Sequence, residues 1–416
     1  MRTSVTIRRP EGALRGNVAL PPSKSVANRA LILAALAGDV DCVKNFGTAQ
    51  DTVILHDLLQ RRPSHMHCGD GGTTFRFLLA WACLQKGEER FITGNARLLQ
   101  RPHAPLVQAL RLLGADITET ASGYHVRGKR MAGGTIKFDS PVSSQFISAL
   151  MLVAPCFYEG LELEWTGLRL STPYVRMTME MLKQFGANAY EDDVAICVKP
   201  GPLLPQETRV PADWSAAAFW FEVAALAPDT ELFFEGLSAS TELQGDKDAV
   251  GLFIFNTHCT QIDDDMILRG RICDNPNPYS ANLLETPDLF QPLIFALAGT
   301  GKEAEITGLH NLPLKETDRL KAVTEALKTL GCSAEYEGGT FNLRGRITNT
   351  FSPTLRPARR SPHGDGLGPA GAGVRRDHDP APGGGEQILS GVLGGDEKGW
   401  VFGGIQLRRL TATAQR

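Results

Sequence analysis

Residues 106–119, LVQALRLLGADITE, begin with apolar side chains at helical spacing, stop at Gly114 and continue as a short alternating run. The same pattern recurs in MTMEMLKQFGANAYE (177–191) and AVTEALKTLGCSAEYE (322–337). Apolar residues three and four positions apart predict an amphipathic helix, glycine marks its end, and alternation predicts an entering strand. The chain therefore contains a repeated helix–glycine–strand unit.

The spacing of these units predicts one more copy. Gly186 follows Gly114 by 72 residues, and Gly331 follows Gly186 by 145, about twice as many. The intermediate position falls near residue 258, where VGLFIFNTHCTQIDDD (250–265) has a helix-like apolar stretch, His258 in place of the glycine, and then a strand-like run. Strands are also expected in ELFFEGL (231–237) and EAEITGL (303–309). The sequence thus predicts an α/β fold of repeated units.

Composition places the chain among ordinary globular proteins. The 416 residues are 42% hydrophobic and 21% charged, enough for two domains or one large domain. A net charge of -3 argues against a broad nucleic-acid or membrane surface. The eight cysteines include no C-x-x-C pair, which favours buried reduced thiols in a cytoplasmic protein. The N-terminal stretch lacks an apolar run, so a signal peptide is not expected.

Several helix starts carry groups that bind anions. Lys24 and Ser25 follow two prolines at the start of an apolar helix, and Arg29 lies one turn later. Backbone N–H groups, the helix dipole and these cations together favour a bound anion, although a capped surface helix is the plainer alternative. Similar starts are expected around Gly69–Thr74, after Arg101, at Ser143–Gln145 and at Ser171–Tyr174. Asp213 and Ser215 are interpreted as helix caps.

Two later motifs add acid–base groups. Asp288 lies between Pro287 and an apolar run. The stretch HNLPLKETDRLKAV (310–323) is predicted to place Lys315, Glu316, Asp318 and Arg319 in the first turn of an amphipathic helix. Cations at that end oppose the helix dipole, so a bound anion is the better explanation. Opposed carboxylates and ammonium groups could also transfer protons; the candidates are Asp288, Glu316, Lys24 and Lys315.

Seven motifs in order resemble the 5-enolpyruvylshikimate-3-phosphate (EPSP) synthase family. They are LPPSKSVANRA, GDGGTTFRFL, RPHAPL, SSQFISAL, STPYVRMT, ETPDLFQPL and LPLKETDRL, and they span residues 20 to 320. The resemblance implies a two-domain inside-out α/β barrel of repeated βαβαββ-type units. We expect the first domain at 1–20 plus 237–350, the second domain at 21–236, and an aberrant tail at 351–416.

The resemblance also implies substrates and roles. The shikimate 3-phosphate site would comprise Ser25, Arg29, Ser143, Ser144, Gln145, Ser171, Tyr174, Asn311 and Lys315. The phosphoenolpyruvate site would comprise Lys24, Asp70, Gly72, Arg101, Gln145 and Arg319. Asp70 stands where many members have Asn. Asp288 resembles the base for the 5-hydroxyl, and Glu316 resembles the group that protonates the enol methylene.

The implied reaction adds the 5-hydroxyl to C2 of phosphoenolpyruvate and then eliminates phosphate, in the pathway to aromatic amino acids. It implies a cytoplasmic monomer with no cofactor or metal. Two alternatives remain open: a related transferase acting on UDP-N-acetylglucosamine, whose typical loop Cys has no counterpart here, and an impaired product that only binds shikimate 3-phosphate.

The last part of the chain departs from this pattern. Residues 361–385 hold eight glycines and four prolines and no amphipathic helix pattern. The family's Asp-His-Arg and Ser-Lys-Ser/Thr motifs are absent, and with them an Arg and a Lys expected to contact phosphoenolpyruvate. Codons can be chosen for residues 361–370 and 386–394 that, read one base later, encode HRMAMALAPL and SKSYPEFW. The first of these peptides supplies the missing Arg, and the second supplies the missing Lys. We therefore predict a frameshift near residues 345–358, and a tail that as written is disordered.

Overall fold

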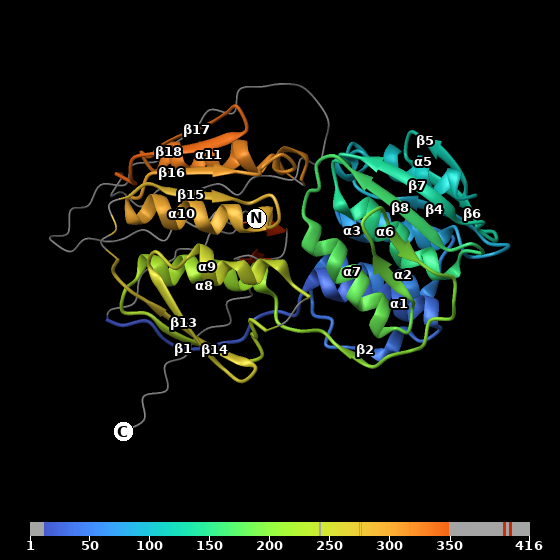
Figure 1. Ribbon diagram of the computed structural model, residues 1–416, viewed down its shortest axis with the longest axis horizontal. Helices are drawn as coiled ribbons and strands as arrows, with labels where there is room; N and C mark the ends of the chain where they lie inside the picture. Colours follow the sequence, from blue (N-terminus) through green and yellow to red (C-terminus); the bar gives the residue numbers. More distant parts are fainter. Residues whose placement is uncertain are drawn as a thin grey trace.

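The computed structural model of the chain describes residues 12–240, 243–273, 275, 277–315, 317–348, 394–396 and 399–401. Two separate hydrophobic cores divide this structure into two bodies (Figure 1). One core runs from Val26 to Val210 and is called here the second domain. The other combines Val18 with residues from Trp214 to Leu343 and is called the first domain.

A single topology recurs in four sheets. Each unit runs strand, helix, strand, helix and two strands, and its sheet has the order first–second–fourth–third. The first two strands are parallel, while the remaining neighbours are antiparallel. The predicted repeat is therefore a βαβαββ unit. The strand orders are β3-β4-β6-β5, β7-β8-β10-β9, β1-β12-β14-β13 and β15-β16-β18-β17.

The second domain contains two whole units and a smaller third part. Its first unit comprises β3 (His65–His67), α3 (Gly72–Ala82), β4 (Glu89–Thr93), α4 (Ala96–Leu99), α5 (Ala104–Leu112), β5 (Asp116–Thr120) and β6 (Gly123–Arg127). Its second unit comprises β7 (Gly134–Asp139), α6 (Ser144–Val153), η2 (Ala154–Cys156), β8 (Leu161–Thr166), α7 (Thr172–Gln184), β9 (Ala189–Glu191) and β10 (Ile196–Val198). The smaller part comprises α1 (Lys24–Ala37), η1 (Val40–Cys42), β2 (Val43–Lys44), α2 (Gln50–Arg61) and β11 (Thr208–Arg209).

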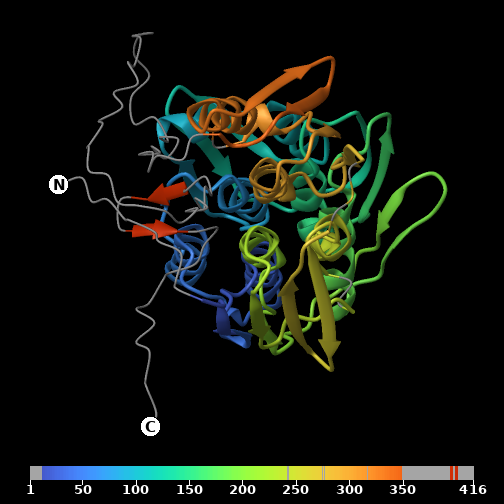
Figure 2. The same ribbon diagram turned by 90° about the vertical axis from the view of Figure 1, so that its left-hand side faces the viewer.

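The first domain has two described units. One comprises β1 (Arg15–Val18), α8 (Trp214–Leu226), β12 (Glu231–Phe234), η3 (Gly245–Asp248), α9 (Ala249–Leu252), β13 (Thr257–Ile262) and β14 (Asp265–Gly270). The other comprises β15 (Tyr279–Asn282), η4 (Pro287–Leu289), α10 (Phe290–Thr300), β16 (Ala304–Thr307), η5 (Leu312–Leu314), α11 (Arg319–Thr329), β17 (Ser333–Glu337) and β18 (Thr340–Arg344). Helices α8 and α10 pack together between the two sheets (Figures 1 and 2).

The predicted helix–glycine–strand units are confirmed at the level of the backbone. Gly114, Gly186 and Gly331 have φ of 106°, 85° and 73°, the left-handed region that lets a helix end without steric cost. The fourth copy is present in reduced form. Its helix α9 has four residues, and His258 lies inside β13 and not at a helix stop.

The chain passes between the domains earlier than the predicted boundary at 236–237. β12 pairs in parallel with β1, and α8 packs on α10. Both elements therefore belong to the first domain. The two crossing segments are hydrogen-bonded to each other: the Ser23 amide donates to the Pro211 carbonyl oxygen (2.8 Å), and the Asp213 amide donates to that of Pro21 (2.9 Å). The whole second domain is thus inserted between β1 and α8 of one unit.

Two further features complete the described chain. β19 (Gly394–Asp396) and β20 (Gly399–Val401) form an antiparallel pair; the rest of the predicted aberrant tail, 351–416, lies outside the described residues. Within the described ranges, no helix is both long and apolar enough to cross a lipid bilayer.

Candidate active site

The first turn of α7 joins the two domains. The Tyr174 hydroxyl donates to Asp288 Oδ2 (2.7 Å), and Asn311 Nδ2 donates to Ser171 Oγ (3.3 Å). The Ser171 amide also donates to the Leu284 carbonyl oxygen across the same junction (2.9 Å). Four residues predicted from distant parts of the sequence therefore meet where the domains touch.

Asp288 is the centre of this junction. Lys315 Nζ and Arg319 NH1 donate to its Oδ1, at 3.3 and 2.6 Å, while Tyr174 holds the other oxygen. Burial acts to raise the pKa of Asp288, but the charges of Lys315 and Arg319 and the hydrogen bonds outweigh it and hold the pKa well below its ordinary value. Burial, together with the negative charges of Asp246, Asp288 and Asp213, raises the pKa of Tyr174. Asp288 is therefore ionised and Tyr174 is a neutral donor.

The sequence predicted that Lys315 and Arg319 both lie in the first turn of one helix, and this is true only of Arg319. α11 begins at Arg319, and Asp318 caps it by accepting from the Lys321 amide. Lys315 instead follows the 3₁₀ turn η5, which Pro313 helps to start. Lys315 still reaches Asp288, so the expected cluster forms from two short elements. Glu316, the predicted proton donor, lies outside the described residues.

Lys24 opens α1 as predicted, and its partner is a residue that the sequence reasoning missed. Lys24 Nζ lies 2.7 Å from Asp51 Oδ2, and Asp51 stands in the first turn of α2. Thr74 Oγ1 donates to the Asp51 carbonyl oxygen (2.9 Å), which ties α2 to the glycine-rich start of α3. An acidic residue at a helix start was the only available signal.

The start of α3 brings two arginines together over a glycine. A Cβ built on Gly72 would lie 2.4 Å from Arg101 NH1 and 2.8 Å from Arg76 NH1, so any side chain at this position would make both guanidinium groups shift. Arg76 NH1 also donates to Gln145 Oε1 (2.6 Å), which links α3 to the start of α6. Both arginines are buried. Gly72, Arg101 and Gln145, predicted together, therefore do lie together.

His103 lies buried beside these two arginines. Burial and the nearby charges of Arg76 and Arg101 lower the pKa of His103 to about 4, against the opposing effect of a hydrogen bond to the Leu98 carbonyl oxygen. The ring is therefore neutral at physiological pH, and the cluster does not gain a third cation there.

The remaining predicted residues lie at the same helix starts. Ser143 caps α6 by accepting from the Gln145 amide, and Ser144 is its first residue. Ser25 lies in the first turn of α1. Asp70 lies two residues before Gly72, in the loop that ends at α3.

Arg29 is placed differently from its neighbours. It is fully buried, and all three of its nitrogens donate to protein oxygens: Thr178 Oγ1 (2.7 Å), the Ser25 carbonyl (2.8 Å), Ser148 Oγ (3.1 Å) and the Tyr174 carbonyl (3.2 Å). Burial lowers its pKa to about 10. In this arrangement Arg29 fastens α1 to α6 and α7.

Two buried carboxyls near the junction were not predicted as site groups. Asp213 caps α8 as interpreted, by accepting from the Ser215 amide (3.2 Å), and Asp246 Oδ2 accepts from the Ser215 hydroxyl. Burial raises the pKa of each carboxyl to about 7, and the charge of Asp288 acts in the same direction. The charge of Lys24 opposes this shift at Asp213, and that of Lys315 opposes it at Asp246. Both groups are thus poised between acid and carboxylate near neutral pH.

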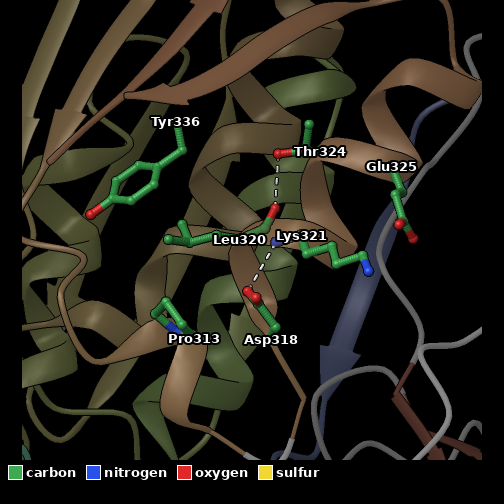
Figure 3. A pocket seen from close by; sticks show the side chains of 7 residues that line it. All are labelled: Pro313, Asp318, Leu320, Lys321, Thr324, Glu325 and Tyr336. Atoms are coloured by element: carbon green, nitrogen blue, oxygen red, sulfur yellow. Dashed lines mark hydrogen bonds between the residues drawn. The ribbon is translucent and has the colours of Figure 1, made fainter. Parts of the chain in front are cut away.

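A separate pocket of about 360 Å³ opens beside α11 and β17 (Figure 3). It is lined by Pro313, Asp318, Leu320, Lys321, Thr324, Glu325 and Tyr336. None of the predicted site residues lines it, and the hydrogen bonds drawn there are internal to α11. Among the side chains that the structure describes, no group of three or more His, Cys, Asp or Glu is arranged to hold a metal ion.

Comparison with known proteins shows the family of this chain. The family described as EPSP synthase (3-phosphoshikimate 1-carboxyvinyltransferase) matches residues 8–62 and 56–359. A 3-phosphoshikimate 1-carboxyvinyltransferase of Bacteroides fragilis (strain YCH46) is 34% identical over 323 residues, covering 76% of this chain and 78% of that protein. One from Korarchaeum cryptofilum is 31% identical, covering 78% and 82%.

Solved structures show the same fold. The structure of EPSP synthase from Acinetobacter baumannii superposes with a TM-score of 0.63 at 22% identity, covering 85% of this chain and 86% of that one. The predicted two-domain inside-out α/β architecture is thereby confirmed.

Proposed function

Because the chain belongs to the EPSP synthase family, we propose that its fold transfers the enolpyruvyl group of phosphoenolpyruvate to the 5-hydroxyl of shikimate 3-phosphate and releases phosphate. The observation that supports this best is the junction of Tyr174, Asp288, Lys315 and Arg319, where a carboxylate and two cations from one domain meet a phenol from the other. Such a site can bind anions and move a proton between them.

The two substrates are assigned to the two groups of helix starts. Shikimate 3-phosphate would lie against Ser25, Ser143, Ser144, Gln145, Ser171, Tyr174, Asn311 and Lys315, with Arg29 holding α1 and α7 in register. Phosphoenolpyruvate would lie against Lys24, Asp70, Gly72, Arg101, Gln145 and Arg319. The guanidinium groups of Arg76 and Arg101, which meet beside Gly72, support a cationic site there. Lys24 would exchange its ion pair with Asp51 for one with the substrate.

The proposed reaction has two steps. In the first step, the oxygen of the 5-hydroxyl bonds to C2 of phosphoenolpyruvate while Asp288 accepts the hydroxyl proton. C3 gains a proton from Glu316 or Lys24. The C2–O bond to phosphate then breaks, C3 loses a proton, and the enol ether forms. Lys24, Arg101 and Arg319 would stabilise the departing phosphate.

The low pKa of Asp288 fits a base that is activated by its substrates. In the structure its negative charge is neutralised by Lys315 and Arg319. Phosphate and carboxylate groups bound beside these cations would compete for them, which raises the pKa of Asp288 and makes it a stronger base. We also propose that the protein is a cytoplasmic monomer; the absence of any C-x-x-C pair among its eight cysteines favours the cytoplasm.

The function is tested with a chain whose residues from about 350 onward are read in the frame offset by one base. Phosphate release should require both shikimate 3-phosphate and phosphoenolpyruvate, and UDP-N-acetylglucosamine should not replace the first. Calorimetry should also show shikimate 3-phosphate binding to the 416-residue chain as written. No phosphate release with shikimate 3-phosphate, or release with the UDP-sugar, would refute the proposal.

In the chain read in the offset frame from about residue 350, replacing Gly72 with Ala should weaken the use of phosphoenolpyruvate. The added methyl displaces the two buried guanidinium groups, and a charge-assisted contact is worth roughly 1.5–3 kcal/mol, about 10- to 100-fold in KM. The KM for shikimate 3-phosphate should change little. Gly201→Ala, where a Cβ meets nothing within 4 Å, is the matched control. Equal KM values for phosphoenolpyruvate in the two variants would contradict the assignment.

A further inference from the structure

One contact across the domain junction involves no residue assigned above. A Cβ built on Gly245 would lie 2.4 Å from Pro173 Cβ and 2.7 Å from its Cγ. Gly245 belongs to the turn η3 of the first domain, while Pro173 lies in the first turn of α7. The φ of Gly245 lies outside the left-handed region. The need for glycine here is therefore steric and comes from the other domain.

The turn that carries Gly245 is fixed on both sides. Gln244 is buried; its Nε2 donates to the Ala212 carbonyl oxygen (2.7 Å) and its Oε1 accepts from the Trp214 amide (3.0 Å). On the other side, buried Asp246 accepts from the hydroxyl of Ser215. Both anchors hold the turn against the start of α8 and the crossing segment, so Gly245 cannot retreat from Pro173 without breaking them.

Pro173 is held just as firmly. Its neighbours Ser171 and Tyr174 make the hydrogen bonds to Leu284, Asn311 and Asp288 described above. Ser171 also has a left-handed backbone (φ 55°), which a serine rarely adopts. The rigid ring of Pro173 thus packs against Gly245 of the first domain, between the hydrogen bonds that Ser171 and Tyr174 make to proposed binding and catalytic groups.

We propose that Gly245 is a positioning residue of the active site: its missing side chain sets how closely the first turn of α7 approaches the first domain, and thereby places Tyr174 and Ser171 against Asp288 and Asn311. Carbon atoms in ordinary contact are about 3.5–4.0 Å apart, so an added methyl must move α7 by about 1 Å or more. A displacement of that size can lower catalysis by about 10²-fold. The expected effect on catalysis rests on the proposed function, whereas the positioning of α7 does not.

The test uses the 416-residue chain without substrate, by hydrogen exchange at the Ser171 amide. That amide is expected to exchange slowly in the parent, because it donates to Leu284 across the junction. In Gly245→Ala its exchange should be at least about 10-fold faster, which corresponds to about 1.4 kcal/mol. Gly251→Ala is the matched control, since Gly251 lies six residues away and a Cβ there meets nothing within 4 Å. In the Gly251→Ala variant, the Ser171 amide should exchange at the same rate as in the parent.

Two further variants separate positioning from a loss of folding. Gly245→Ala combined with Pro173→Gly removes the clashing ring atoms and should restore slow exchange. Pro173→Leu adds bulk to the same contact from the second domain, so it should reproduce the fast exchange even if Gly245→Ala fails to fold. Slow exchange in both enlarged variants, fast exchange in Gly251→Ala, or fast exchange in the parent would overturn the proposal. None of these readouts needs substrate, so a failure of the proposed function would appear separately, as absent phosphate release.

Discussion

Reading the chain from about residue 350 in the frame offset by one base is expected to raise turnover by about 10²–10⁴-fold. As written, the chain lacks the family's last Arg and Lys contacts to phosphoenolpyruvate, and each charge-assisted contact is worth roughly 1.5–3 kcal/mol. Phosphate release by the two purified chains, at equal concentration with both substrates, measures the difference. The 416-residue chain should show negligible release.

Both the sequence and the extent of the family match support the offset frame. Residues 361–370, SPHGDGLGPA, can be encoded by TCA CCG CAT GGC GAT GGC CTT GGC CCC GCT. One base later the same DNA encodes HRMAMALAPL, and CGA for Arg360 supplies the preceding Asp. EQILSGVLG, from Glu386, encodes SKSYPEFW in the same offset. The family match ends at residue 359, which agrees with a change of frame close to that point.

Two results would contradict the frameshift. One is a coding DNA that does not encode both motifs in the offset frame, which sequencing the gene across residues 345–416 decides directly. The other is turnover by the chain as written at the rate of an intact enzyme. As a control for folding, shikimate 3-phosphate should bind both chains, because all the residues proposed for that substrate precede residue 320.

Local sequence patterns predicted the repeated units of the fold, whereas the pairing of strands from distant segments could not be inferred from the sequence. A glycine that stops a helix acts within a few residues, so Gly114, Gly186 and Gly331 could be recognised from their neighbours. The pairing of β1 with β12 joins residues more than 200 positions apart. Nothing near residue 236 shows that β12 belongs with the N-terminal strand, which is why the predicted crossing falls too late.

The same distinction applies to the site. Lys24, Gly72 and Asp288 stand in recognisable helix-start motifs, and the structure places them in the first turns of α1, α3 and η4. Asp51 and Gly245 have no motif of their own. Their importance lies in what they touch, a lysine 27 residues away and a proline of the other domain, and only the folded chain shows those contacts.

Asp288→Asn in the frame-restored chain is expected to lower kcat by about 10²–10⁴-fold, the usual contribution of a general base. The amide has a similar shape and can still accept from Tyr174, but it cannot take the proton of the 5-hydroxyl. Binding of shikimate 3-phosphate should be kept or become tighter, since Lys315 and Arg319 lose the carboxylate that neutralises them. Steady-state kinetics and calorimetry separate the two effects.

The matched control is Asp248→Asn, which removes an exposed carboxylate from the turn η3 of the same domain. Its kcat should stay within about 2-fold of the parent, because the charge of an exposed side chain is screened by solvent and salt. A kcat for Asp288→Asn close to that of Asp248→Asn would exclude Asp288 as the base. The clamp of Tyr174, Lys315 and Arg319 around Asp288 would then serve only to join the domains, and the proton acceptor would have to be sought at Asp213 or Asp246, whose raised pKa values already place them near neutrality.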